Sequence, residues 1–471
     1  MKTETNYIKK HIGKKLFVVG AVAVLISSVG CEKFLEVDEP QNQISQSMVF
    51  KDKKLAYAAL SDVYSNLRSN TLLNGGLAGV GTLMGCYTDE LTSVSNQPVD
   101  FRSFYELGVQ PNTPTVNTLW VNSYKQIYAV NSIIEGVLRS VAYLDESTML
   151  QILGEAYFIR GLLHFYMVEL YGDIPYVSTT DYNINQSVSR MSVSEVYLRI
   201  EEDLRKAETM LTDTYPSANR THINRSGLRL SLARLYLYQN KWSEARNYAS
   251  LVIQNPAYSV EQDLSKTFLK DSKSAVWQFM PVDAGINTLE GQYYTFLTLP
   301  PANVVLSQSL LNSFEAGDQR KVQWTKKLSN SQLSYSHAYK YKQYNKTSTT
   351  SLEYSVVLRI EEAYLILAES ENELGNTGSA LIAVNKLRTR AGLTALSGLS
   401  QQQLRTAILD ERRHELFTEY GHRFFDLKRK GLLDNTLSPL KPAWQNFRKL
   451  LPLPERELFA NPKLNPQNEG Y

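Results

Sequence analysis

Apolar residues recur every three or four positions along four long segments of the chain, which is the spacing that places them on one face of an α-helix. This periodicity predicts helices over Lys53 to Leu67, Leu119 to Arg139, Ser147 to Leu170 and Ser194 to Leu211. A fold made mainly of packed helices is therefore expected.

Long stretches rich in turn residues separate these patterns and are expected to be loops, which often carry function when they are this long. They cover Asn70 to Gly85, Ser93 to Thr118, Tyr171 to Met191 and Val282 to Ala302. Tyrosines alternate with polar residues from Ala338 to Tyr344, which fits either a half-exposed strand or an extended loop.

Two distant segments match each other without gaps, Leu232 to Ala245 and Leu367 to Ala380. Both carry a pair of alanines twelve positions apart, a spacing similar to that of the tetratricopeptide repeat. Small residues at that spacing let two antiparallel helices approach closely, and Asn240 and Gly375 suit the left-handed turn between them. The sequence therefore predicts a helical hairpin at each segment.

The composition is that of an ordinary globular protein, with 471 residues of which 43% are hydrophobic. The formal net charge is +3, which gives no electrostatic footprint for nucleic acid. Cys31 and Cys86 are the two cysteines, so no disulfide framework is expected. Cys86 is expected to be a small core residue.

The N-terminus has the pattern of an export signal. Lysines between Lys9 and Lys15 precede an apolar run from Leu16 to Ile26, and small residues then lead to Cys31. This pattern resembles a bacterial lipoprotein signal, in which residues 1–30 would be removed and Cys31 would carry lipid. The apolar run is shorter than the roughly 20 residues that a membrane-spanning helix needs. Ser28 stands where a leucine is usual, which leaves cleavage and lipidation open.

Signatures of catalysis are not found in the sequence. It has no His-Glu-x-x-His zinc helix, no Gly-x-Ser-x-Gly elbow and no phosphate loop. The spacing of Gly79, Gly81 and Gly85 misses the dinucleotide fingerprint by one residue, and no helix signal is evident there, which favours a flexible loop.

Histidines and acidic residues give no stronger signal of chemistry. The six histidines show no metal-ligand spacing, so neither a metal nor a cofactor is expected. The adjacent acids Asp89 with Glu90, and Glu361 with Glu362, would point in different directions on a helix. Solvated faces or helix caps are therefore expected for them rather than a glycosidase pair.

Binding remains as the function that the residues support. Sugars present apolar C–H faces ringed by hydroxyl groups, so their sites combine exposed aromatic rings with amide and charged groups. Tyrosine supplies both properties, and this chain has 29. Aromatic residues in the expected loops are the candidate ligand contacts, namely Phe101, Phe104, Tyr105, Tyr182, Tyr293 and Tyr294.

A longer motif lies near the C-terminus. Glu411 to Gly431, ERRHELFTEYGHRFFDLKRKG, resembles the helix, turn and second helix that mark the SusD/RagB family of outer-membrane nutrient-binding lipoproteins. Similar family patterns occur in Gly154 to Val177, in the helix that carries Trp120, Tyr124, Ile127 and Asn131, in Leu450 to Tyr471, and in CEKFLEVDEP at Cys31. Tyr420 and Glu469 depart from the family pattern, which leaves only local structure open.

The residues of the Glu411 to Gly431 motif have their own physical interpretation. Arg412 and Glu415 lie three positions apart, and Asp426 and Lys430 lie four apart, so each pair shares a helix face. Gly421 and Gly431 are expected where the two helices end. The motif is therefore expected to be a scaffold without a ligand.

The resemblance implies a mostly α fold. Tetratricopeptide-like helical hairpins would form a right-handed superhelical scaffold, with long irregular loops and a few short strands, as in SusD-like proteins. Residues 31–471 would make one SusD-like domain, with an N-terminal part over 31–230 and a C-terminal part over 231–471.

The resemblance also implies a function without chemistry. The protein would be anchored in the outer membrane through Cys31, face the cell surface, bind an oligosaccharide and deliver it to a TonB-dependent, SusC-like transporter. Three alternatives stay open at this point: an anchored glycan hydrolase, a peptide-binding member of the same family, and a repeat adaptor without a small ligand.

Overall fold

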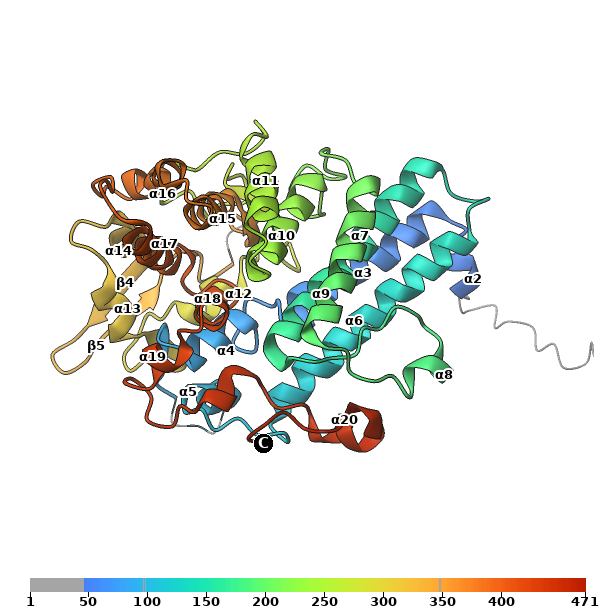
Figure 1. Cartoon of the computed structure of the whole chain (residues 1–471), viewed down its shortest axis with the longest axis horizontal. Helices are drawn as coiled ribbons and strands as arrows, with labels where there is room; N and C mark the ends of the chain where they lie inside the picture. The colour runs from blue at the N-terminus through green and yellow to red at the C-terminus, as the bar shows by residue number, and fades with distance from the viewer. Residues whose placement is uncertain (1–45, 96, 98, 347–348) are drawn as a thin grey trace, which may run out of the picture. The chain divides into compact units, whose positions relative to one another are not determined.

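The computed structural model describes residues 46–95, 97, 99–346 and 349–471. Helix α2 (Gln46–Val49) belongs to a first unit that covers residues 1–49, and residues 50–471 form a second unit. The second unit is mostly helical (Figure 1). Within the described residues, no helix combines the length and apolar character that a membrane crossing requires. Cys31 lies outside the described residues.

Four long helices pack together in the first half of the second unit (Figure 1). They are α3 (Lys53–Asn70), α6 (Pro114–Arg139), α7 (Glu146–Tyr171) and α9 (Val193–Met210). The four helices predicted from periodicity are confirmed, with ends that move by a few residues. Helix α6 begins earlier than predicted because Pro114 suits the first turn of a helix. Helix α7 is buried along most of its length because it contacts α3, α6, α9 and α10.

Two helical hairpins occur where the internal repeat predicts them. They are α10 (Arg225–Tyr238) with α11 (Trp242–Ile253), and α15 (Ile360–Glu373) with α16 (Thr377–Arg390). The turn residues are left-handed, with φ of 56° at Asn240 and 84° at Gly375. The alanines of both repeats are completely buried. Helix α17 (Gln401–Leu416) packs on α15 and α16 and closes their core.

Short strands form three antiparallel pairs among the described residues. They are β1 (Leu91–Ser93) with β3 (Val304–Leu306), β2 (Ala275–Phe279) with β6 (Ser355–Arg359), and β4 (Thr325–Ser329) with β5 (Ser334–Ala338). Strand β5 ends at Ala338, so the segment from Ala338 to Tyr344 is an extended loop and the strand alternative is wrong. Its Lys340 is buried and ion-paired, which the alternating pattern could not reveal.

Short helices interrupt the segments that the sequence predicts as loops. They are α4 (Val80–Tyr87), α5 (Asp100–Tyr105), α8 (Tyr182–Asn185) and α12 (Leu289–Tyr294). Helix α4 corrects the prediction of a flexible glycine loop, because it begins directly after Gly79. A Cβ atom on Gly81 would lie 2.8 Å from the carbonyl oxygen of Thr418, so this glycine allows close packing.

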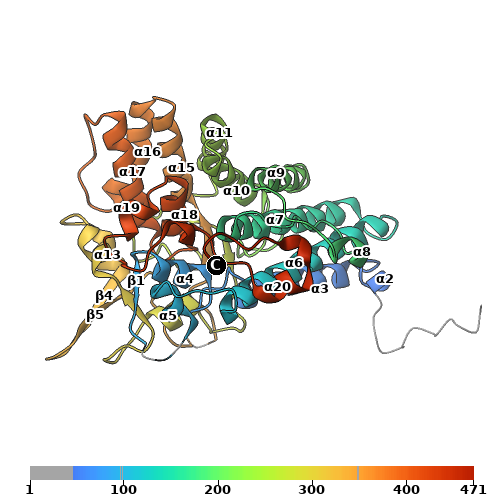
Figure 2. The same ribbon diagram turned by 60° about the horizontal axis from the view of Figure 1, so that its bottom comes forward.

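Further short elements complete the second half. They are α13 (Gln308–Ser313), α14 (Gln319–Trp324), α18 (His422–Arg429), α19 (Leu433–Leu437), α20 (Glu455–Ala460) and the 3-10 helices η2 (Asn446–Lys449) and η3 (Pro462–Leu464). Figure 2 shows α20, near the C-terminus, beside α6 and α8.

The Glu411 to Gly431 motif forms the end of α17 and the whole of α18, and both Arg412 and Glu415 pair with residues outside α17. Arg412 bonds Asp426 at 2.7 Å, across the turn between the helices. Glu415 instead accepts bonds from three buried arginines of other segments, Arg320, Arg359 and Arg390. The predicted role of Gly421 is wrong, because α17 ends at Leu416 and Gly421 caps the start of α18 with φ of 76°. Gly431 follows α18 as predicted.

Candidate functional site

The six predicted aromatic contacts do not lie together. Phe101, Phe104 and Tyr294 are at most 5% exposed, so these three cannot offer a ring face to a ligand in this conformation. Phe104 packs on Tyr87, and the Tyr294 hydroxyl forms a hydrogen bond of 2.9 Å with Thr82. Their burial follows from the short helices α5 and α12, which turn one face inward.

The other three candidates are accessible to different degrees. Tyr105 is half-buried, and the ammonium group of Lys441 lies 4.5 Å from its ring centre. Tyr182 is 73% exposed on α8. Tyr293 is half-buried at the end of α12. A Cβ atom added to Gly76 would lie 3.4 Å from the ring of Tyr293. Gly76 therefore leaves room for the ring of Tyr293.

Three rings lie in a row at the end of β5 and just after α12 and β5, and we call Phe296, His337 and Tyr339 the loop platform. Buried His337 stands between half-exposed Phe296, at 4.7 Å between ring centres, and half-exposed Tyr339, at 5.6 Å. The ammonium groups of Lys326 and Lys342 lie 4.9 and 5.4 Å from the ring centre of Tyr339. Burial lowers the pKa of His337, so this ring is neutral near pH 7.

The loop platform joins aromatic faces to hydrogen-bond donors. Sequence reasoning did not select Phe296 and Tyr339 as contacts. The tyrosine alternation around Tyr339 was a signal for the second, whereas Phe296 is marked only by its place in a long loop.

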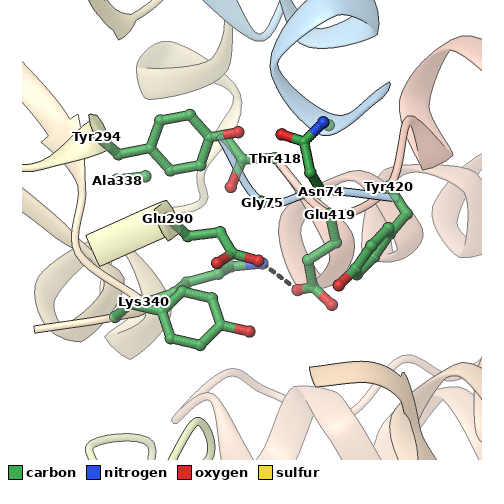
Figure 3. Close-up of a pocket in the computed structure, with 11 residues that line it drawn as sticks. Asn74, Gly75, Glu290, Tyr294, Ala338, Lys340, Thr418, Glu419 and Tyr420 are labelled. Carbon is green, nitrogen blue, oxygen red and sulfur yellow. Dashed lines mark hydrogen bonds and ion pairs between the residues drawn. The ribbon is translucent and has the colours of Figure 1, made fainter. Parts of the chain in front are cut away.

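A small cavity lies among the segments next to these loops (Figure 3). Asn74 and Gly75, Glu290 and Tyr294, Lys340, and Glu419 and Tyr420 line it from four separate stretches of chain. Its volume is about 20 Å³, close to the space that a single water molecule occupies, so a sugar ring does not fit. The cavity is therefore not a ligand site. We call the buried polar residues around it, Glu290, Lys340, Ser355 and Glu419, the ionic joint.

Lys340 makes the main contacts of the ionic joint. The ammonium group of Lys340 donates to Glu419 Oε1 at 2.5 Å (Figure 3). It also donates to the carbonyl oxygens of Glu415 and Phe417. Burial lowers the pKa of Lys340 to about 8, although Glu419 acts in the opposite direction. Each of these contacts ties the platform loop to the end of α17.

The carboxyl group of Glu290 completes the joint from α12. Its Oε1 accepts the hydroxyl of Ser355, and burial raises its pKa. A Cβ atom on Gly75 would lie 2.1 Å from its carboxyl carbon, so this glycine makes room for the acid. Segments around Gly75, α12 and β6 are thus held together next to the stretches of chain that lead to Phe296 and from Tyr339.

The adjacent acids that a hydrolase pair would require are buried. Asp89 pairs with Arg413 and Arg423 at 2.7 and 2.9 Å, and Glu362 pairs with Arg234 at 2.6 Å. Glu361 pairs with Arg359 and Arg390. The expectation of solvated faces or caps is wrong for these acids, because arginines from distant segments compensate their burial.

Other reactive side chains also have structural environments. Burial raises the pKa of the Cys86 thiol to about 12, and Cys86 is fully buried as predicted. Burial lowers the pKa of His164 to about 3, and His164 stacks on Tyr176. Among the described residues, no cluster of His, Cys, Asp and Glu is arranged to hold a metal ion.

Comparison with known proteins places this architecture in a family. A family model described as "Starch-binding associating with outer membrane" matches residues 33–237, and one described as "SusD family" matches residues 308–471. The chain belongs to the SusD/RagB family. The resemblance inferred from the sequence motifs is therefore confirmed, and this SusD-like chain is mostly helical with a few short strands, as predicted.

Relatives match this SusD-like chain over most of its length. SusD-like protein P25 of Formosa agariphila is 25% identical, with 96% of this chain and 99% of the relative covered. A SusD superfamily protein of Bacteroides vulgatus has a crystal structure with a TM-score of 0.79 at 21% identity, covering 89% of this chain and 99% of the other. A structure titled "Laminarin binding SusD-like protein" has a TM-score of 0.75 at 21% identity, covering 89% and 99%.

Proposed function

We propose that this protein is a surface-exposed nutrient-binding lipoprotein that captures an oligosaccharide and passes it unchanged to a TonB-dependent outer-membrane transporter. Membership in the SusD/RagB family supports this function, and one model of that family is described as starch-binding and associated with the outer membrane. The observation that carries the proposal is the loop platform, in which half-exposed rings stand beside two lysines.

The platform suits a sugar for physical reasons. A pyranose ring offers a C–H face that packs on the rings of Phe296 and Tyr339, while its hydroxyl groups can accept bonds from Lys326 and Lys342. The ionic joint next to the platform loops holds both loops in place before a ligand arrives, so little ordering is required on binding. Tyr293 on α12 is half-buried, and we take it as a further candidate contact.

Capture without cleavage is the second part of the proposal. Hydrolysis of a glycosidic bond needs two carboxyl groups that flank the substrate. Asp89, Glu361 and Glu362 are instead engaged by buried arginines, and the platform presents lysines rather than acids. A hydrolase is therefore less well supported than a receptor.

Membrane attachment and transporter contact complete the proposal. The lipoprotein signal that ends at Cys31 would hold the protein in the outer membrane. Packed helical hairpins offer the large surface that a lasting contact with a transporter needs. The aromatic faces of the platform favour a glycan over a peptide as the nutrient.

Titration calorimetry with single alanine variants tests the platform. Tyr339→Ala and Tyr293→Ala should each weaken binding of laminarihexaose or maltohexaose by roughly 1 to 3 kcal/mol, the scale of a lost aromatic contact in a binding site. Tyr143→Ala is the matched control, because Tyr143 is 59% exposed and lies outside the platform. Affinity that stays unchanged in Tyr339→Ala would exclude the platform as the binding site, and unchanged affinity in Tyr293→Ala would exclude Tyr293 as a contact. Tyr294 is left intact in this test because its side chain is buried.

A further inference from the structure

A groove separate from the loop platform lies between α6, α8 and the C-terminal segment that includes α20, and we call it the α6–α8–α20 groove. Figure 2 shows these three elements next to one another. The groove has a volume of about 410 Å³, within the roughly 300 to 1,000 Å³ that is typical of ligand pockets. It shares no lining residue with the loop platform.

Aromatic rings form much of the lining of this groove. Trp120, Tyr124 and Tyr128 stand four positions apart on α6, so their side chains follow one face of that helix. Tyr128 is 51% exposed, and Tyr182 contributes a ring that is 73% exposed from α8. Large rings left this exposed in one concave surface indicate a contact surface rather than core packing.

The deeper rings are fixed in place before any ligand binds. The hydroxyl of Tyr124 donates to the carbonyl oxygen of Pro175 at 2.8 Å. Trp120 lies 4.9 Å from Tyr124 and meets Tyr171 edge to face at 5.1 Å, between ring centres. Rings held in this way lose little conformational freedom when they contact a ligand.

Amide and carboxyl groups accompany the rings. Asn185 donates from Nδ2 to the carbonyl oxygen of Thr179, and Asn461 donates to that of Val188, both at 2.8 Å. These bonds orient the two amides, while Gln186 and Glu457 add further polar groups to the lining. None of the described lining residues is Lys or Arg. A carboxylate without a lining cation disfavours acidic or phosphorylated ligands.

We propose that the α6–α8–α20 groove is a second binding site, and that it takes a short segment of a neutral oligosaccharide. Exposed Tyr128 and Tyr182 would pack on sugar faces, and the amides with Glu457 would bond the hydroxyl groups. This inference rests on the proposed function of glycan capture. It extends that function, because the groove would give the same class of ligand a second contact surface on other elements of the fold.

The test uses the full mature protein with Tyr128 and Tyr182 both changed to alanine. Both side chains are exposed, so the double variant should keep its melting temperature. Laminaritriose and maltotriose are the neutral probes, and trigalacturonic acid is the acidic probe. Tyr143→Ala is the control for loss of an exposed tyrosine. Phe296→Ala with Tyr339→Ala is the platform variant, which removes platform contacts instead.

Calorimetry should show two sites in the wild type for a neutral trisaccharide. The groove variant should lose one of them, with affinity there reduced roughly tenfold or more, the effect of removing a central aromatic contact. The platform variant should keep the groove site, and trigalacturonic acid should not compete there. Stronger binding of the acidic probe, or of a peptide library, in the groove would overturn the neutral-glycan assignment.

The outcomes separate this inference from the proposed function. Equal stoichiometry and affinity in the wild type and the groove variant would overturn the groove site, while loss of binding in the platform variant would still support glycan capture. A wild type that binds neither neutral trisaccharides nor their hexasaccharides would overturn both.

Discussion

Replacing Glu415 by glutamine tests whether the Glu411 to Gly431 motif is a scaffold. The carboxylate of Glu415 is fully buried and accepts bonds from Arg359 at 2.6 Å, Arg390 at 2.5 Å and Arg320 at 3.1 Å. These guanidinium groups hold the pKa of Glu415 well below its ordinary value despite the burial. Glutamine keeps the shape of the side chain but removes the charge that the three arginines share.

The expected loss of stability follows from this geometry. Removing one partner from a buried ion pair destabilises a protein by about 3 to 5 kcal/mol, because the remaining charge is left uncompensated. Glu361, Glu411 and Glu419 still pair with the same arginines, which places the expectation near the lower end, about 3 kcal/mol. A domain with a total stability of about 5 to 15 kcal/mol would remain folded.

Urea unfolding followed by circular dichroism measures this loss. Glu202→Gln is the matched control, because Glu202 bonds Arg199 at the surface, where an ion pair contributes about 0 to 1 kcal/mol. A loss below about 1 kcal/mol in Glu415→Gln, with an unchanged dependence on urea, would refute the scaffold role. Loss of glycan affinity at full stability would show instead that the motif contacts the ligand.

The remaining predictions concern a buried acid and the membrane anchor. Burial raises the pKa of Glu90 from 4.5 to about 7, so the folded protein binds a proton at Glu90 more tightly than the unfolded chain does. The resulting stabilisation is complete below pH 4.5 and is lost as the pH rises through 7. Between pH 5 and 8 the free energy of unfolding, measured by urea titration, should fall by about 2 to 3 kcal/mol more in the wild type than in Glu90→Gln. An equal pH dependence in the two proteins would contradict this. Cys31→Ala should move the protein from the membrane fraction to the soluble fraction, and retention in membranes would exclude the lipid anchor.

The helical framework could be predicted because its signals are local. The spacing of apolar residues predicted the four long helices, and the turn residues Asn240 and Gly375 indicated where the two hairpins turn. The short helices in the loops could not be predicted, because their stability comes from packing rather than from their own sequence. Helix α4, for example, lies close to the backbone at Thr418, and Gly81 allows this approach because it has no side chain.

The candidate binding surfaces were harder to predict than the fold. Tyr293 and Tyr294 are neighbours in sequence, yet one is half-exposed and the other buried, since adjacent residues of α12 point in different directions. In the sequence, Trp120 and Tyr124 form part of a family pattern, and neither they nor Tyr128 were predicted as ligand contacts. Their partners in the groove come from α8 and the C-terminal segment, and only the tertiary structure brings these together.

Whether the protein holds a glycan and leaves its bonds intact is measured most directly on the wild type. Laminarihexaose and maltohexaose are titrated into the mature protein by calorimetry, and the recovered mixture is then analysed for shorter sugars. Saturable binding of at least one hexasaccharide with unchanged chain length is the predicted result. New reducing ends, or no binding of either sugar, would contradict it.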